Sequence, residues 1–119
     1  MSRKKTGAHI AGWLSARHDC NEGRFIQIGN SLLLCREYQQ LTAGAKNTYQ
    51  CMSMESGGQR EFVFPLSAAK KYGIAEQTLR RHIDELTASG FITVRSGASL
   101  RQPNIYSFSF EWKTNNAAK

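Results

Sequence analysis

The chain has 119 residues, a formal net charge of +7 and a sequence pI near 9.7. This length suits one domain with its own hydrophobic core, and 40% hydrophobic with 21% charged residues is ordinary for a globular protein. No apolar run approaches the roughly 18 residues that cross a bilayer. The basic start MSRKK is not followed by a signal-peptide core. We therefore expect no membrane partner and a cytoplasmic location.

The cysteines indicate neither a disulfide framework nor a metal centre. Cys20, Cys35 and Cys51 are an odd number without a CxxC pair. The HxC formed by His18 and Cys20 lacks a second ligand pair at zinc-site spacing. Cys35 and Cys51 lie among apolar residues and are expected to fill space in the core. The sequence therefore predicts no metal and no cofactor.

Residues 1–24 are expected to form a basic N-terminal arm, since they contain five basic and two acidic residues. The segment HIAGWLSARHD favours a short helix with Ile10, Trp13 and Leu14 on one side. Glycines in and beside this segment disfavour the helix. Partial disorder of the arm is the alternative.

The middle of the chain, residues 25–59, carries no net charge and predicts an extended piece followed by two helices. GRFIQIG is typical of the extended piece. Ser31 can cap a short helix that ends near Tyr38, and Thr42 can cap a longer helix over residues 43–54. A stripe of apolar side chains around the longer helix should be buried: Leu41, Ala45, Tyr49 and Met52.

A loop and a short strand precede the next helices. SGGQR, residues 56–60, predicts the loop, and EFVF, residues 61–64, alternates as a strand that Pro65 ends. The pattern LSAAKKYGIAEQTLRRHIDEL then predicts two helices separated by a tight turn at Gly73 and Ile74, as a helix-turn-helix requires. Three residues would pack the first helix against the second: Leu66, Ala69 and Tyr72.

The second of these helices is strongly amphipathic. Four residues are predicted to share its buried face: Ala75, Leu79, Ile83 and Leu86. The opposite face carries Gln77, Arg80, Arg81, Asp84 and Ala88. Gly90 supplies the left-handed residue that ends the helix.

A β-hairpin with a polar tip follows. Residues 91–95 form its first strand, and alternation over residues 106–112 predicts the second strand. One face of that strand should be buried through its aromatic residues, which are Tyr106, Phe108, Phe110 and Trp112. The connecting segment, SGASLRQPN, is polar and basic.

Helix, turn, helix and β-ribbon, in this order, indicate an α+β fold of the winged helix-turn-helix type, with helices packed on a small antiparallel hairpin. The sequence GIAEQTLRRHIDELTASGFI resembles the GIS-x-x-T-x-x-R-x-I-x-x-L-x-x-x-GFI pattern of bacterial winged-helix DNA-binding proteins, the broad MarR- and GntR-like group. The matching residues are Gly73, Ile74, Thr78, Arg81, Ile83, Leu86, Gly90, Phe91 and Ile92. Ala75 departs from the pattern, because a capping Ser is usual at that position.

The segment ending in NIYSFSFEW is similar to small winged-helix proteins of plasmid, phage or transposon origin. We expect a winged-helix domain over residues 25–112, between the arm and a polar tail of residues 113–119. The excess positive charge lies on the arm and on residues 60–110, which suits a surface that faces nucleic-acid phosphates.

The second helix of such a motif enters the DNA major groove, where Gln can bond adenine and Arg can bond guanine. The candidate reading residues are therefore Glu76, Gln77, Thr78, Arg80 and Arg81. Candidate wing contacts to phosphate or to the minor groove are Arg95, Ser96, Ser99, Arg101, Gln102 and Asn104. The arm adds Arg3, Lys4 and Lys5 as candidate phosphate contacts.

Double-stranded DNA is thus the expected partner at the bacterial nucleoid, for a transcriptional regulator or a replication or maintenance protein of a mobile element. A homodimer is left open. The alternative is a winged-helix scaffold whose polar helix face meets another protein, and the strand aromatics could instead stack on single-stranded nucleic acid. No enzyme is expected, because no phosphate-binding loop or nucleophile motif is present. His82 is expected to be structural, and the adjacent Asp84 and Glu85 point in different directions.

Overall fold

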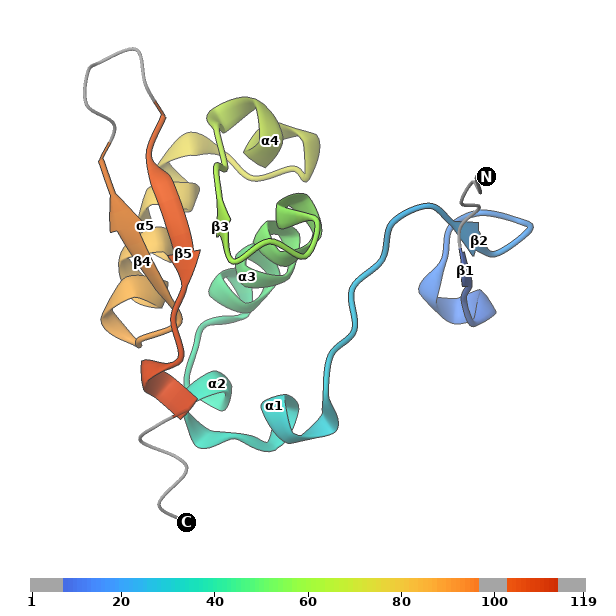
Figure 1. Ribbon diagram of the computed structural model, residues 1–119, viewed down its shortest axis with the longest axis horizontal. Coiled ribbons are helices and arrows are strands. Elements are labelled where there is room, and N and C mark those ends of the chain that lie inside the picture. The colour runs from blue at the N-terminus through green and yellow to red at the C-terminus, as the bar shows by residue number, and fades with distance from the viewer. Residues whose placement is uncertain (1–7, 97–102, 114–119) are drawn as a thin grey trace.

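The chain forms an α+β fold in which helices pack on a small antiparallel sheet (Figure 1). The computed structural model describes residues 8–96 and 103–113. In chain order the elements are β1 (Ala8–His9), the 3-10 turn η1 (Gly12–Leu14), β2 (Asn21–Glu22), α1 (Asn30–Leu34), α2 (Arg36–Gln39), α3 (Ala43–Ser56), β3 (Glu61–Phe62), α4 (Leu66–Lys71), α5 (Glu76–Ala88), β4 (Ile92–Arg95) and β5 (Ile105–Phe108).

Helix α3 begins where the sequence predicts. The Thr42 hydroxyl accepts a hydrogen bond from the Ala45 backbone N–H at 3.2 Å, which caps the first turn. The same threonine donates its backbone N–H and its hydroxyl to the Glu85 carboxylate of α5, at 2.7 and 2.8 Å. The helix ends at Ser56, two residues beyond the predicted end, and Gly57 follows with a φ of 64°. These bonds tie the start of α3 to α5.

The turn between α4 and α5 is also confirmed. Gly73 has a φ of 80°, and the Ile74 N–H donates to the Ala69 carbonyl at 2.9 Å, which closes the end of α4. Ile74 is buried beneath the turn. The prediction that Ala75 lies on the buried face is wrong, because Ala75 precedes the first turn of α5 as its exposed N-cap and provides no side-chain cap.

Helix α5 ends at Ala88, and Gly90 adopts the predicted left-handed conformation, with a φ of 84°. The Phe91 N–H donates to the Leu86 carbonyl at 2.9 Å across this end. Leu79 and Leu86 are buried as predicted, whereas Ile83 is only half-buried. It lies at the margin of the core because the sheet covers the helix on one side only.

The sheet has the strand order β3-β5-β4, and both neighbouring pairs are antiparallel. Tyr106 and Ser107 of the central strand β5 each pair with both neighbours, Tyr106 with Phe62 and Val94 and Ser107 with Glu61 and Thr93. The strand predicted over residues 61–64 is shortened to two residues, because β5 offers partners only to Glu61 and Phe62.

The predicted second strand of the hairpin is too long. Strand β5 ends at Phe108, so the alternation with one buried face stops there. Phe110 is 52% exposed beneath the Arg60 guanidinium, which lies 4.9 Å from its ring centroid. Trp112 lies on a helical turn at residues 111–113 and stacks on Phe91 with centroids 4.9 Å apart. Beyond β5 this end of the chain is held by the stacked rings and by the Ser109 N–H, which donates to the Phe91 carbonyl at 2.9 Å.

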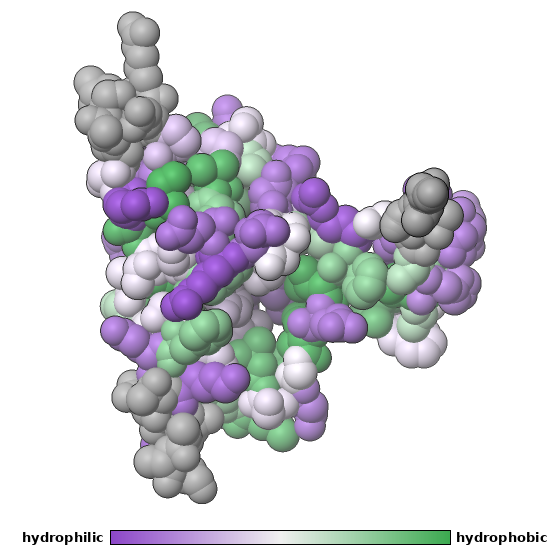
Figure 2. All heavy atoms as spheres, viewed as in Figure 1, coloured by the Kyte–Doolittle hydropathy of each residue, from purple (hydrophilic) through white to green (hydrophobic). Residues whose placement is uncertain are grey.

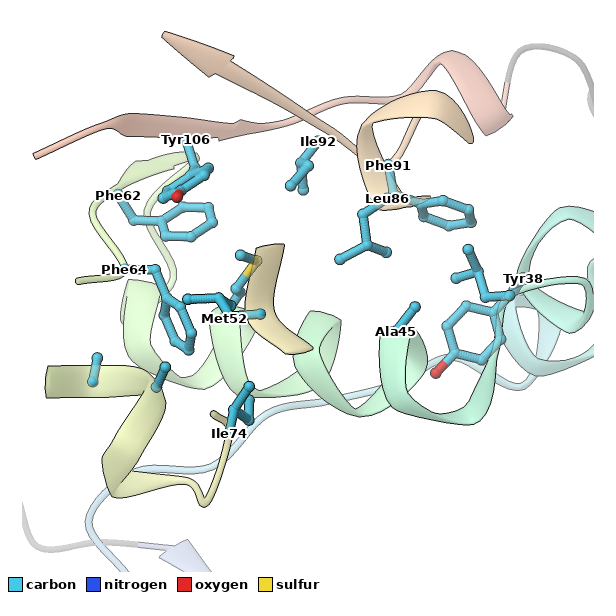
Figure 3. Packing of buried hydrophobic residues seen from close by; sticks show 14 of the residues in the cluster. Tyr38, Ala45, Met52, Phe62, Phe64, Ile74, Leu86, Phe91, Ile92 and Tyr106 are labelled. Carbon is cyan, nitrogen blue, oxygen red and sulfur yellow. The ribbon is translucent and has the colours of Figure 1, made fainter. Parts of the chain in front are cut away.

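The hydrophobic core lies between α3, α5 and the sheet (Figure 3). Phe91, Ile92 and Leu86 point from the α5–β4 side toward Ala45 and Met52 of α3. Burial of such side chains is the main stabilising contribution in a domain of this size, at about 1.5–3 kcal/mol for each. Cys35 is buried in this core as predicted, and Cys51 packs against it half-buried.

The segment before α3 differs from the prediction of one short helix capped by Ser31. Cys35 has an extended ψ of 134° and divides the segment into α1 and α2, and Gly29 is the N-cap of α1. The side chain of Cys35 is buried in the core, and its extended backbone interrupts the helix. Residues 23–29, the predicted extended piece, have no strand partner and form a linker.

The described part of the N-terminal arm is a small hairpin and not the helix that Trp13 and Leu14 suggested. Strands β1 and β2 pair in antiparallel register, and only the three-residue turn η1 is helical. Figure 1 shows this hairpin set apart from the rest of the fold, at the end of the linker. We call residues 8–22 the N-terminal hairpin and residues 30–96 with 103–113 the body.

Candidate nucleic-acid interface

Helix α5 presents three polar sides, and each has a different environment. One side faces outward, a second faces α3, and a third faces β5. Leu79 and Leu86 occupy the remaining side in the core. The helical period of the sequence distinguishes buried from exposed positions of α5. Which polar residues face outward, α3 or β5 depends instead on the elements that pack beside the helix.

The outward side carries Gln77 and Arg81, one turn apart, followed by Asp84 and Ala88; all four are exposed. Among the described residues, the side chains of Gln77 and Arg81 have no hydrogen-bond or ion-pair partner. Their amide and guanidinium groups are therefore available to a partner. Both groups can form two parallel hydrogen bonds, which is the geometry that distinguishes base edges in a duplex.

The second side packs against α3. The Nδ1 atom of His82 lies 2.7 Å from the Thr48 hydroxyl, and Thr48 is completely buried. Burial lowers the pKa of His82, and the neighbouring charge of Arg81 lowers it further, so the neutral form of the ring is favoured. Thr78 is half-buried on this side, which leaves it less accessible than Gln77. The histidine has a structural contact, and it fixes α5 against α3.

The third side borders a groove of about 390 Å³ between α5, the start of α4 and the end of the wing segment that enters β5. Glu76 and Arg80 line it, joined by an ion pair of 3.2 Å at i,i+4 spacing. Both side chains are more than half exposed. Arg80 is therefore engaged by Glu76 and turned toward the wing, unlike Arg81.

The base of the wing lies beside this groove. Arg95 at the end of β4 is exposed, and its guanidinium approaches the Glu61 carboxylate at 4.0 Å. Ser96 and Asn104 are exposed, and Asn104 also lines the groove. The structure thus brings Arg95, Ser96 and Asn104 to one end of the sheet. The other predicted contacts lie outside the described residues, namely Ser99, Arg101 and Gln102 of the wing and Arg3, Lys4 and Lys5 of the arm.

Sequence reasoning missed the apolar part of the groove lining, which includes Pro65, Leu66 and Pro103. These residues come together only because β5 pairs beside β3, which places the start of α4 next to the wing. No local pattern indicates such a contact. The groove is lined both by α5 and by Pro103, Asn104 and Tyr106 around the start of β5.

No three or more His, Cys, Asp or Glu side chains in residues 8–96 and 103–113 are grouped so that they could hold a metal ion. Within the same ranges, no helix is long and apolar enough to cross a membrane.

Comparisons with protein-family models, with curated proteins and with solved structures find no match for this chain. Its function must therefore be inferred from its own residues and their arrangement.

Proposed function

We propose that residues 25–112 form a winged helix-turn-helix domain that binds double-stranded DNA in a sequence-specific manner. The order α3, β3, α4, α5, β4, β5 supports this fold, because a helix-turn-helix is followed directly by a hairpin whose second strand lies at the centre of the sheet. Helix α5 then corresponds to the helix that enters the major groove.

The observation that carries the proposal is the outward pair of Gln77 and Arg81. Both side chains are exposed near the N-terminal half of α5, where a recognition helix contacts base edges. The helix beneath them is held against α3 at two points, by the contact of His82 with Thr48 and by that of Glu85 with Thr42. A rigid helix with two bidentate side chains is suited to discriminating between bases, at about 1–3 kcal/mol for each good pair.

The wing supplies the electrostatic part of the proposed interface. Arg95, together with Arg101 from the basic loop, contacts phosphates or the minor groove beside the site that α5 occupies. Contacts of this kind attract any duplex and orient the domain without reading its sequence. The groove of about 390 Å³ lies between α5, with the proposed base contacts, and the wing, with the proposed phosphate contacts.

The protein acts in this proposal as a DNA-binding protein and not as an enzyme. Its role is that of a transcriptional regulator or of a replication or maintenance protein of a mobile element, as the sequence resemblance implies. Duplex DNA as the partner also implies a cytoplasmic location at the nucleoid.

Binding-site selection from random duplexes tests the proposal. We expect the wild-type chain to enrich a defined motif, and Gln77→Ala or Arg81→Ala to relax the preference at one or two base pairs, each by about 1–3 kcal/mol. Arg36→Ala is the matched control for Arg81→Ala, since Arg36 is an exposed arginine of α2, away from the N-terminal half of α5. It should retain the wild-type motif.

Thr78→Ala distinguishes backbone contact from base contact. Thr78 lies next to Gln77 and is only half-buried, so we propose that its hydroxyl contacts the DNA backbone. Its removal should weaken binding to all duplexes evenly and leave the motif unchanged. If the chain enriches no motif, or if all variants return the wild-type motif, α5 does not read DNA. A scaffold whose polar helix face binds another protein would then be the better explanation.

A further inference from the structure

A large groove on the body is lined by none of the residues of the proposed DNA-binding surface. It has a volume of about 870 Å³ and opens between the linker, the C-terminal end of α3 and the sheet. Its lining includes the rings of Phe25, Tyr49, Phe108 and Phe110. Ligand sites in proteins span roughly 300–1,000 Å³, so the groove has room for one or two large side chains.

The N-terminal hairpin carries apolar side chains without a partner in the described structure. Trp13 is 87% exposed and Leu14 is 70% exposed, and both belong to the turn η1. Figure 2 shows hydrophobic side chains on the drawn face between the body and the hairpin. An exposed tryptophan next to an exposed leucine is uncommon on a monomer and typical of an interaction surface.

We propose that the chain forms a homodimer by exchange of N-terminal hairpins, in which Trp13 and Leu14 of each copy insert into the aromatic groove of the other. Each copy contributes one anchor and one groove, so the two contacts are equivalent and the assembly closes with two-fold symmetry. The interface needs no element beyond those that each chain already presents.

Apolar contact, and not charge, favours the pairing. The described residues that line the groove include two arginines, Arg24 and Arg60, and none is acidic. The two acidic residues of the hairpin are outweighed by the basic residues of the arm, Arg3, Lys4, Lys5 and Arg17. The exposed Trp13 and Leu14 and the aromatic lining of the groove are the complementary surfaces.

The geometry of the linker favours a second copy over the chain's own hairpin. Residues 23–27 form one wall of the groove, and Arg24 Nη1 lies 3.4 Å from the Met54 carbonyl oxygen. The hairpin leaves this wall and lies away from the body (Figure 1). To insert its own Trp13, the chain would have to reverse at Gly23 and remove the wall that shapes the groove.

Sedimentation equilibrium of the full chain without DNA tests the dimer. We expect the mass to rise with concentration from 13.4 kDa for one chain to twice that value. Trp13→Ala should weaken dimerisation by about thirtyfold or more, as the loss of a central tryptophan anchor does. This variant should leave the fold intact, because the side chain is 87% exposed. Leu33→Ala is the matched control, since Leu33 is an exposed apolar residue of α1 outside the groove.

Mixing two defective chains identifies exchange specifically. Met54→Lys places a charge in the groove and leaves the hairpin intact, whereas Trp13→Ala leaves the groove intact. Each variant alone should be monomeric, and an equimolar mixture should recover a heterodimer with one intact contact. A wild-type chain that stays monomeric, or a Trp13→Ala chain that dimerises normally, overturns the proposal. Because DNA is absent, either result is independent of the proposed DNA binding.

Discussion

The imidazole of His82 on α5 occupies the space that a side chain at position 44 of α3 would need. An ideal Cβ on Gly44 would lie 2.4 Å from His82 Nε2, which is closer than any real contact of this kind. The ring cannot easily move away, because its Nδ1 atom is bonded to the buried Thr48 hydroxyl at 2.7 Å. The glycine therefore sets how closely the two helices approach.

Gly44→Ala should destabilise the protein by about 1–3 kcal/mol, the usual cost of overpacking. In a His82→Ala background the same change should stabilise it by up to about 1 kcal/mol, because alanine favours helix over glycine. Denaturant unfolding of the wild type, both single variants and the double variant measures both effects. If Gly44→Ala changed the free energy of unfolding in the same direction in both backgrounds, the steric explanation would be contradicted.

Protonation of His82 should destabilise the fold. The pKa of His82 is lowered from its ordinary value of 6.5 by burial, so the unfolded chain binds a proton at a higher pH than the folded chain. The free energy of unfolding should therefore fall as the pH decreases below about 6.5, until the folded histidine also titrates. Urea unfolding between about pH 5 and pH 8 measures this loss.

His82→Gln is the control for this pH dependence, since it retains a polar side chain opposite Thr48 and removes the titrating group. The difference in unfolding free energy between wild type and variant should vary with pH in the same window. His9 and His18 are present in the wild type and in the variant, so their contributions cancel in the difference. A difference that is constant across the range would show that His82 does not carry the effect.

Arg95 and Arg101 should contribute affinity without sequence preference. Replacing both by alanine should weaken binding to all duplexes and make the dependence of log K on log salt shallower by about one unit for each lost phosphate contact. The measurement is a fluorescence titration at several salt concentrations, with the selected motif and a scrambled duplex. Unchanged slopes would remove the wing from the interface, and Arg36→Ala again controls for the loss of charge.

Local sequence signals predict much of the helical part of the fold. Thr42 as a cap, Gly73 in the turn and Gly90 at the end of α5 act through backbone geometry within a few residues, so the sequence identifies them. The break at Cys35 and the end of β5 at Phe108 depend on long-range contacts, with the core and with the two-residue strand β3. No local pattern contains that information.

The same distinction applies to the candidate site. Periodicity predicts that Gln77 and Arg81 are exposed, and they are. It does not separate Arg80 from Arg81, because both belong to the polar face. Only the packing of the wing beside α5 turns Arg80 toward the groove, and only the approach of α3 explains the environment of His82.

The pair of Glu76 and Arg80 gives the last prediction. Their ion pair of 3.2 Å engages one arginine and adds a carboxylate near the proposed phosphate contacts. Glu76→Gln should therefore strengthen binding to every duplex and steepen the salt dependence by about one unit, because Arg80 becomes available to a phosphate. An exposed pair of this type stabilises a helix by only about 0.3–0.5 kcal/mol, so the fold should be retained. The double variant Glu76→Gln with Arg80→Ala should lose the steeper slope. If Glu76→Gln weakens binding instead, the carboxylate itself contacts DNA, as an acceptor for a cytosine amino group.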